Sequence, residues 1–342
     1  MEGDLKSVYK LYCLFTVGLT ISSLRETTKA RNRRSHNCLC RKVLCIALIV
    51  FSECSINMQA NFRQILHNFL KNEGKAFCTT STALSKPFTK VSEADGVREI
   101  TLCGPARNAL SVNMMEEITH NITKDQDDVD LRVIVLKAEG PIFSAGHNLK
   151  ELNSDSKDVH RAVFKTASKM MLSILHCPVP VVASVHGLAA AAGCQLVAGC
   201  DIAICSENAS FSTPGAQVGI FCSTPGIALA RAVPSKIAAD MLFTGDTISA
   251  QKALQYGLVS RVVPDALLGE ELSKVTSSIC AKSRSVIELG KKFLYSQIQQ
   301  DIFTAYRLGE NVMISNVSMI DAQEGMNSFL SKRKPQWKHT SE

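Results

Sequence analysis

Short apolar strands alternate with amphipathic helices along most of this 342-residue chain, which predicts an α/β fold. Two observations carry the prediction. Residues 97–102, 131–138 and 178–185 are strand-like, and the last of these (PVPVVASV) is apolar throughout, as in a strand buried on both faces of a sheet. Between and after these segments, apolar residues recur every three or four positions, which indicates helices.

The first helix is expected to begin near Ser111, whose hydroxyl can cap it. A second helix is predicted over 158–175, and core packing is favoured over a ligand stripe for its apolar face. That face consists of Val163, Phe164, Ala167, Met170, Met171 and Ile174. The small-residue stretch 189–198 is interpreted as a closely packed helix, and residues 202–205 as a strand. Further helices are predicted over 235–243, 249–256, 265–282, 284–299 and 301–331.

No Gly/Ser-rich linker divides the chain after residue 90. We therefore expect one domain with a core over residues 91–264 and a helical C-terminal region over 265–342. The 46% hydrophobic and 20% charged residues are ordinary for a globular protein.

The positive charge belongs to the front of the chain. Residues 1–90 hold 14 Lys and Arg against 5 Asp and Glu, which leaves 24 basic and 26 acidic residues for the rest. No basic cluster is evident in that larger part, so binding to nucleic acid is not expected.

The front itself contains two different patterns. Residues 1–57 hold apolar runs at 11–21 and 43–51 that are shorter than the roughly 20 residues of a membrane span, so no stable span is expected. Residues 58–90 resemble a mitochondrial presequence, because an acid-poor amphipathic segment precedes a Ser/Thr-rich one. Its apolar face is Phe62, Ile65, Leu66, Phe69 and Leu70. The hypothesis is a matrix protein translated from Met58, with residues 1–57 an alternative or mispredicted N-terminus; an ordinary surface helix is the other interpretation.

Thirteen cysteines raise the question of a metal site. The group His36, Cys38, Cys40 and Cys45 lacks a second paired half, so no metal site is expected. The cysteines after residue 90 lie in apolar stretches and are interpreted as buried, reduced side chains.

Two turns rich in Gly and Ala carry the candidate chemistry. FSAGHNLKEL (143–152) and HGLAAAAGCQLVAGCD (186–201) each bring bare backbone N–H groups to the end of an apolar strand. Two such N–H groups converging on one point can bind the oxygen of a thioester and hold the charge that it gains as an enolate.

Together with their neighbours, these residues resemble the crotonase (enoyl-CoA hydratase/isomerase) superfamily over roughly residues 91–338. The motifs that carry the resemblance are RNALS (107–111), FSAGHNLKEL, residues 178–204, FTGDTISAQKALQYGLVSRVV (243–263) and EGMNSFLSKRKPQW (324–337). The resemblance implies a crotonase-like spiral of repeated ββα units with a helical C-terminal trimerisation region. It also implies a CoA thioester as substrate or ligand, no other cofactor, and a homotrimer or a dimer of trimers.

The resemblance places the two oxyanion N–H groups at His147 and Ala192, where a helix start would aim its positive end at the oxygen. The paired glutamates that hydratases use as acid and base correspond to Gln195 and Gly215. Glutamine cannot take up a proton and glycine offers no side chain, so ordinary hydratase turnover is expected to be severely impaired. The His147 imidazole is either an acid or base or a packing group.

The resemblance also implies a set of substrate-binding residues: Arg107, Ala145, His147, Asn148, Leu149, Lys150, Phe329 and Lys332. Phe329 and Lys332 would reach the CoA of a neighbouring subunit; a solvated basic tail is the alternative. The opening segment GPARNAL (104–110) is one residue shorter than the family pattern. Asp201 is expected to hold structure together.

Three functions remain open from the sequence. The first is an enzyme that acts on acyl-CoA through enolate stabilisation without the glutamate pair, by decarboxylation or thioester hydrolysis. The second is a non-catalytic acyl-CoA sensor or binding protein of lipid metabolism. The third, a nucleic-acid-binding relative, is disfavoured by the charge distribution.

Overall fold

The structure is a computed structural model that describes residues 86–153 and 155–340. The predictions for residues 1–85, which include the two short apolar runs, the presequence-like helix and the His/Cys group, lie outside the described residues.

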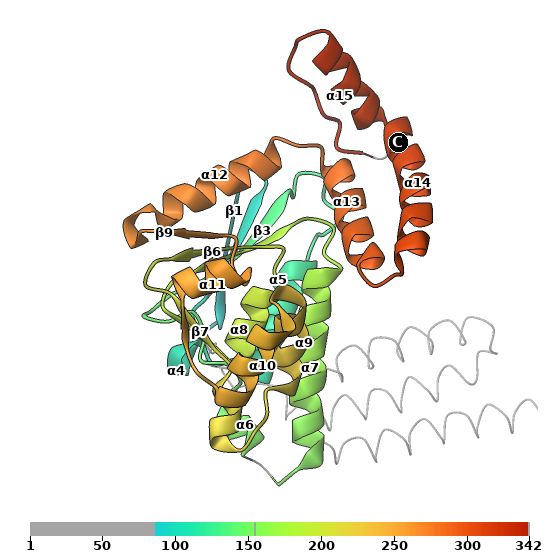
Figure 1. The fold of residues 1–342 in the computed structure, drawn as a ribbon. Coiled ribbons are helices and arrows are strands. Elements are labelled where there is room, and N and C mark those ends of the chain that lie inside the picture. Colours follow the sequence, from blue (N-terminus) through green and yellow to red (C-terminus); the bar gives the residue numbers. More distant parts are fainter. Residues whose placement is uncertain (1–85, 154, 341–342) are drawn as a thin grey trace, which may run out of the picture. The chain divides into compact units, whose positions relative to one another are not determined.

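A six-stranded sheet runs through the centre of the described unit, in the order β1-β2-β3-β4-β6-β9 (Figure 1). Its strands are β1 (Thr89–Ala94), β2 (Val97–Leu102), β3 (Val133–Ala138), β4 (Val181–Val185), β6 (Ile202–Ser206) and β9 (Arg261–Val263). The five strands from β2 onward are parallel, and β1 pairs antiparallel with β2. The predicted strands over 97–102 and 202–205 are confirmed. Those over 131–138 and 178–185 are confirmed from Val133 and Val181 onward.

A second, three-stranded sheet has the order β5-β7-β8, with β5 at Leu188–Ala190, β7 at Ser210–Ser212 and β8 at Ile248–Ser249. The chain passes twice from a strand of the large sheet to one of the small sheet and then to a helix, as β4-β5-α8 and β6-β7-α9. These passages are the ββα units of the predicted spiral.

The helices follow the sheets in chain order. They are α4 (Pro105–Asn108), α5 (Val112–Thr123), α6 (Leu149–Leu152), α7 (Lys157–Leu175), α8 (Ala192–Ala198), α9 (Ser223–Ala232), α10 (Ser235–Thr244), α11 (Ala250–Tyr256), α12 (Leu268–Cys280), α13 (Arg284–Gln297), α14 (Ile302–Ser318) and α15 (Ile320–Leu330), with short 3-10 helices η3 (Pro214–Val218) and η4 (Asp265–Leu267). Ser111 caps α5 as predicted, because its hydroxyl accepts a hydrogen bond from the Met114 N–H at 3.2 Å.

Two sequence predictions are wrong in their boundaries. The stretch 189–198 is not one helix, because residues 188–190 pair in parallel with β7 and the helix begins only at Ala192. Residues 301–331 form two helices, since Met319 adopts an extended conformation (φ −65°, ψ 147°) between α14 and α15.

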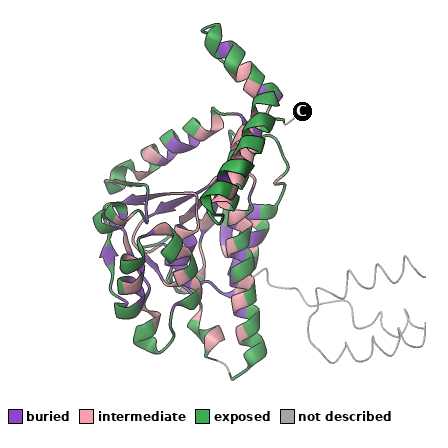
Figure 2. Ribbon diagram, turned by 45° about the vertical axis from the view of Figure 1, so that its right-hand side comes forward, coloured by how far each residue is buried: buried purple, intermediate pink, exposed green. Residues whose placement is uncertain are grey.

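The core lies on both faces of the large sheet, and the central strands β3, β4 and β6 are almost wholly buried (Figure 2). Val133 and Val135 of β3 face a cluster that includes Leu272 and Val275 of α12. Ile134 and Leu136 of the same strand face the main core, to which α5, α7 and α8 contribute. Because successive side chains of a strand point to opposite faces of the sheet, β3 contributes apolar side chains to both layers of the core.

Asp201 joins helix α13 to the sheet, as the sequence led us to expect. Its carboxylate accepts hydrogen bonds from the Val181 N–H at 2.6 Å, the Lys291 ammonium at 2.7 Å and the Tyr295 hydroxyl at 2.7 Å. Lys291 also donates to the carbonyl oxygens of Ile174 and Val179. The ion pair is 7% and 14% exposed, so α13 is held to the core by a largely buried, fully hydrogen-bonded charge.

Within residues 86–153 and 155–340, no helix is both long enough and apolar enough to cross a membrane.

Candidate active site

Backbone hydrogen bonds bring the two turns found in the sequence together. The Ala190 N–H donates to the Ser144 carbonyl at 2.9 Å, and the N–H groups of Phe143 and Ser144 donate to the Leu188 carbonyl at 3.0 and 3.2 Å. The first turn follows the carboxyl end of β3 and the second that of β4, which are adjacent parallel strands. Neighbouring strand ends thus position both segments at one edge of the sheet.

Two glycines permit this close approach. A Cβ atom on Gly146 would lie 2.9 Å from the Ala190 carbonyl oxygen, and one on Gly193 would lie 2.7 Å from the Ser144 carbonyl oxygen. Both distances are shorter than any ordinary contact of a Cβ atom. Any side chain at either position would therefore separate the two turns.

The amides of His147 and Ala192 are left free by the contacts that hold the turns. In the parallel bridge between Leu110 and His147, the bonds run from the Leu110 N–H to the Gly146 carbonyl and from the Asn148 N–H to the Leu110 carbonyl. The His147 N–H therefore points away from Leu110. Ala192 is the first residue of α8, where a helix leaves its N–H without an internal partner.

The residue before α8 has a strained backbone. Ala191 has φ 48° and ψ −114°, a conformation that is costly for any residue with a Cβ atom. Its N–H donates to the Ser212 carbonyl at 2.9 Å, so the small sheet holds it in this conformation. Ala192 itself does not have a positive φ, and its methyl group is compatible with the turn.

The His147 imidazole packs edge-on against Phe164 of α7, with ring centroids 5.6 Å apart and planes at 84°. Both ring nitrogens are buried and have no hydrogen-bond partner among the described residues. Burial lowers the pKa of this imidazole, which keeps it neutral near pH 7. Phe164 is a functional neighbour that the sequence identified only as a core residue.

The two positions that the sequence resemblance matched to the hydratase glutamates have different surroundings. Gln195 lies in α8 and is 6% exposed, and its backbone N–H donates a hydrogen bond to the Ala191 carbonyl at 3.0 Å. Gly215 lies in η3, where a Cβ atom would sit 2.1 Å from the Ile220 carbonyl oxygen and 2.7 Å from the Cys222 sulfur. The segment 220–222 therefore occupies the space that a side chain at position 215 would need.

Ile220 and Cys222 are site residues that sequence reasoning missed, because only the return of the chain after η3 brings them to Gly215. The Ile220 N–H donates to the Gly215 carbonyl at 2.9 Å, which closes that turn. Burial raises the pKa of the Cys222 thiol, and it raises that of the neighbouring Cys194 to about 12. Neither sulfur is therefore a thiolate nucleophile at neutral pH.

The remaining predicted binding residues near the first turn surround its backbone. The Ala145 N–H donates to the Arg107 carbonyl at 3.1 Å, and both residues are exposed. Asn148 caps α6 through its side-chain oxygen, which accepts from the Lys150 N–H at 3.2 Å. Leu149 is 55% exposed. Arg107, Ala145, Asn148, Leu149 and Lys150 thus belong to one neighbourhood.

Phe329 and Lys332 are not part of that neighbourhood within one chain. Phe329 is 83% exposed near the end of α15, and Lys332 follows the helix with φ 54°. Figure 1 shows α15 at the opposite end of the described unit from α6.

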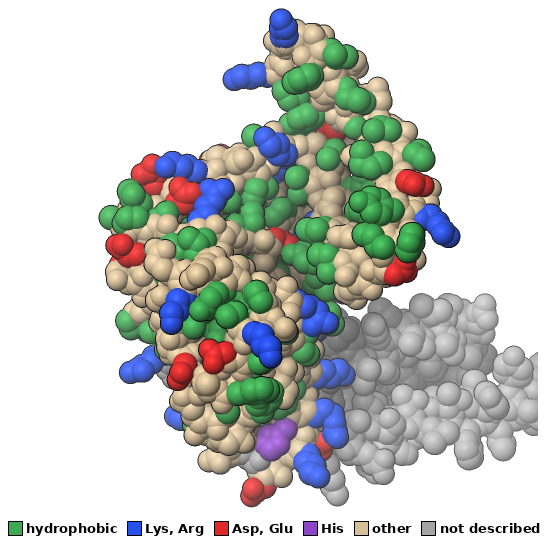
Figure 3. Space-filling model, in the orientation of Figure 1, with side chains coloured by type: hydrophobic (Ala, Val, Ile, Leu, Met, Phe, Trp, Pro, Cys, Tyr) green, Lys and Arg blue, Asp and Glu red, His purple; other side chains and the backbone are tan. Residues whose placement is uncertain are grey.

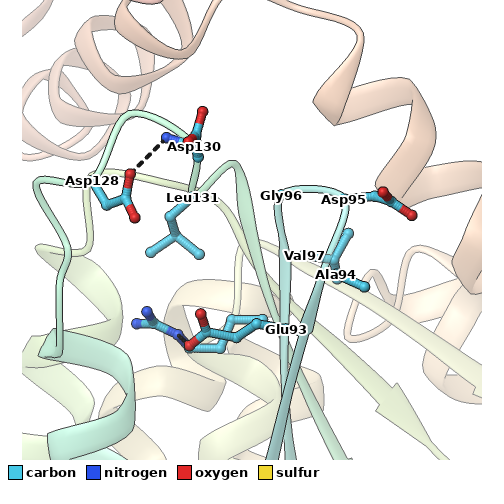
Figure 4. A pocket seen from close by; sticks show the side chains of 9 residues that line it. Glu93, Ala94, Asp95, Gly96, Val97, Asp128, Asp130 and Leu131 are labelled. Atoms are coloured by element: carbon cyan, nitrogen blue, oxygen red, sulfur yellow. Dashed lines mark hydrogen bonds and ion pairs between the residues drawn. The ribbon is translucent and has the colours of Figure 1, made fainter.

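An acidic hollow lies at the other edge of the sheet, where β2 and β3 begin (Figure 4). It is lined by Glu93, Ala94, Asp95, Gly96, Val97, Arg98, Asp128, Asp130 and Leu131. Arg98 is already paired with Glu93 at 2.7 Å, and Asp128 accepts the Asp130 N–H. Its acids make it unsuited to a phosphorylated ligand. No cluster of three or more His, Cys, Asp or Glu suited to a metal occurs in the described part of the chain.

Comparison with known proteins agrees with this geometry. Residues 92–340 match the family described as enoyl-CoA hydratase/isomerase. The human enoyl-CoA hydratase domain-containing protein 3, named mitochondrial, is 54% identical over 253 residues, which are 73% of this chain and 84% of that protein. The crystal structure of the human protein superposes with a TM-score of 0.72 over 73% of this chain and 100% of that chain, at 52% identity. An enoyl-CoA hydratase structure from Mycobacterium smegmatis gives 0.72, at 41% identity over 75% of this chain and 100% of that chain.

Proposed function

Because the chain belongs to the enoyl-CoA hydratase/isomerase family, we propose that it binds acyl-CoA thioesters and stabilises their enolate between the His147 and Ala192 N–H groups. The observation that carries this proposal is the contact between the two turns, which leaves both amides unused by the bonds that hold the turns together. Each donor of an oxyanion hole contributes on the order of 3 kcal/mol to transition-state stabilisation.

The same site is not equipped for hydration. Addition of water to a 2-enoyl thioester needs one group to activate water and one to deliver a proton. The Gln195 amide can orient a water molecule but does not transfer its proton at neutral pH, and Gly215 contributes no group. Since the Ile220 carbonyl fills the space beside Gly215, the second acid is replaced by backbone rather than by an empty position. We expect 2-enoyl hydration to be very slow.

Two outcomes fit a site of this kind. Loss of CO₂ from a malonyl-type thioester leaves an enolate that needs only the oxyanion hole and a proton from water, and thioester hydrolysis needs an ordered water. Alternatively, the protein binds thioesters without turning them over. The His147 ring favours this second function, because it packs against Phe164 and neither of its buried nitrogens is hydrogen-bonded to a described residue, as expected of a packing group rather than an acid or base.

The C-terminal helices support a homotrimer or a dimer of trimers as the working assembly. Their large exposed apolar side chains include Leu294, Ile298, Ile302, Phe303, Tyr306, Met313, Ile314, Val317, Phe329 and Leu330. A subunit contact would cover these side chains and carry Phe329 and Lys332 toward the CoA of a neighbouring subunit. The relatives are named mitochondrial, and we assign this chain to the mitochondrial matrix, with residues 58–90 as its targeting segment.

The test combines binding and product analysis. The purified full chain is titrated by calorimetry with saturated, 2-enoyl and malonyl-type CoA thioesters, and the products are identified by mass spectrometry. Binding with CO₂ loss or free CoA would establish an enzyme, and binding with intact thioester a binding protein. Absence of binding to every thioester would refute the proposal, and rapid hydration of the 2-enoyl thioester would refute its second part.

A pair of variants isolates the oxyanion hole. Ala192→Pro deletes the N–H at the first position of a helix, where proline is tolerated, whereas Ala192→Gly keeps the N–H. We expect the proline variant to lose binding or turnover and the glycine variant to retain it, with thermal unfolding reporting that both are folded. Equal activity in the two variants would exclude this amide as a donor.

A further inference from the structure

Four basic side chains form a row along the exposed face of α7. Lys157, Arg161, Lys165 and Lys169 recur at every fourth position and are all exposed, whereas the opposite face of the helix is buried in the core. Each step of four residues advances about 6 Å and turns about 40°, so the row runs diagonally over about 18 Å. We call these four residues the α7 basic row. In Figure 3, several Lys and Arg side chains (blue) lie one below another along the right-hand side of the described unit, where Figure 1 places α7.

The row is electrostatically unfavourable in the isolated protein. It contains three like-charge pairs at i, i+4 spacing, each of which destabilises the helix slightly. Of the four members of the row, only Arg161 is paired with a carboxylate of a described residue, that of Asp158 at 2.5 Å. Lys157, Lys165 and Lys169 form no ion pair with another described residue. A binding partner that supplies negative charge would relieve this repulsion.

The residues around the row indicate the chemistry of that partner. Leu172, one turn beyond Lys169 on the same face, is 50% exposed. The aromatic rings of α7 are Phe164, which is half-buried against His147, and His160, which is half-buried with its Nε2 atom 3.0 Å from the Leu152 carbonyl oxygen. Neither ring is available for stacking on bases. Single-stranded nucleic acids are usually held by aromatic stacking as well as by charge, and this face provides none. A cluster of four or more Lys and Arg side chains on an amphipathic helix is instead typical of a site that binds anionic lipid headgroups.

We propose that the α7 basic row binds the surface of an anionic phospholipid membrane, so that the protein associates peripherally with a bilayer. A second copy related by a twofold axis would place one basic row against another. This inference goes beyond the proposed function and does not depend on thioester binding.

Vesicle sedimentation with the full chain tests the proposal. The vesicles are phosphatidylcholine alone and phosphatidylcholine mixed with phosphatidylglycerol. Each basic side chain near an anionic surface strengthens binding about fivefold, so Lys165→Glu/Lys169→Glu is expected to weaken binding to the mixed vesicles by at least about 25-fold. Binding should also fall steeply with added salt.

A matched control accounts for the effect of net charge and of the basic residues 1–90 on vesicle binding, because it has the same net charge and the same leader as the α7 variant. Lys236→Glu/Lys252→Glu makes the same change in charge at two exposed positions of α10 and α11, away from α7. This control should bind like the unaltered protein, and Lys165→Arg/Lys169→Arg should also retain binding. Equal loss in the control and the α7 variant would overturn the proposal. So would binding of the row to RNA or to an acidic protein without any binding to vesicles.

Discussion

At the scale of single residues, the site is defined by what glycine allows and what it omits. Gly146 and Gly193 allow two turns to come into contact, whereas at Gly215 the backbone of Ile220 occupies the space that a side chain would need. The first two positions therefore permit the contact between the turns, and the third has no room for a side chain. An acidic side chain at position 215 would require segment 220–222 to move.

Gly215→Ala tests whether that space is filled. The added Cβ would lie 2.1 Å from the Ile220 carbonyl oxygen, so we expect the free energy of unfolding to fall by about 1–3 kcal/mol, as in overpacked cores. Urea denaturation measures the change. Gly269→Ala is the control, since nothing lies within 4 Å of a Cβ there and the residue is in helix α12. A neutral or stabilising effect of Gly215→Ala would show that the segment yields easily.

Burial of the His147 imidazole predicts a dependence of stability on pH. Because its pKa is lowered from 6.5 in the fold, the unfolded chain takes up a proton near that pH that the folded chain does not. The free energy of unfolding should therefore fall as the pH drops through about 6.5. In His147→Phe this part of the decrease should disappear.

The measurement for His147 is urea denaturation at about pH 7.5 and about pH 5.5, on either side of the histidine range. The same substitution at the exposed His120 is the matched control. A decrease that persists unchanged in His147→Phe would assign the dependence to other groups, of which His339 is the first candidate because burial also lowers its pKa.

At the scale of elements, helix α13 depends on a buried charge. Lys291→Met leaves Asp201 without its cation, and breaking a buried pair by removing one partner costs about 3–5 kcal/mol. We expect a loss of this order in chemical denaturation. Lys274→Met, which breaks the exposed pair with Glu270 on α12, should cost less than about 1 kcal/mol. Similar small losses in both variants would show that water replaces the Lys291 ammonium.

Elements with strong local signals were predictable from the sequence, and those made by distant pairing were not. Helix α7 was evident because its buried residues follow the helical period, and α5 because Ser111 caps it. Strand β5 was missed since its alanines favour a helix locally, and only pairing with residues 210–212 makes it a strand. Strand β1 had a usable signal, the Asp95–Gly96 turn with two positive φ angles, which is typical of a two-residue hairpin.

The candidate site was likewise predictable only where the signal is local in the sequence. The positions of His147 and Ala192 were predictable because their turns have a distinctive sequence. The contact of His147 with Phe164 was not, since it joins a loop to the middle of a helix. Nor was the filling of the space beside Gly215, which depends on how the chain returns after η3. The α7 basic row escaped notice because its members are separated by three residues and the chain after residue 90 has a small net charge.

At the scale of the whole molecule, the C-terminal helices expose apolar surface that a single chain does not cover. Phe303 and Tyr306 of α14 are 79% and 72% exposed, and Ile314, two turns further along, is 65% exposed. Exposed apolar side chains in contiguous patches mark interaction sites rather than ordinary surface. Burial of a phenylalanine side chain contributes about 1.5–3 kcal/mol, so each subunit contact would gain several kcal/mol from these residues.

Phe303→Asp should therefore dissociate the assembly. A charged side chain in a closed apolar contact has no partner, and the cost is repeated at every symmetry-related contact of the oligomer. Sedimentation velocity is expected to show a trimer or hexamer for the unaltered protein and mainly monomer for Phe303→Asp. Val129→Asp, at a loop residue that is 42% exposed, is the matched control and should leave the assembly intact. If the Phe303→Asp variant kept its oligomeric state, α14 would not lie in the subunit contact. If it became monomeric and also lost CoA binding while remaining folded, Phe329 and Lys332 would be acting across the subunit boundary.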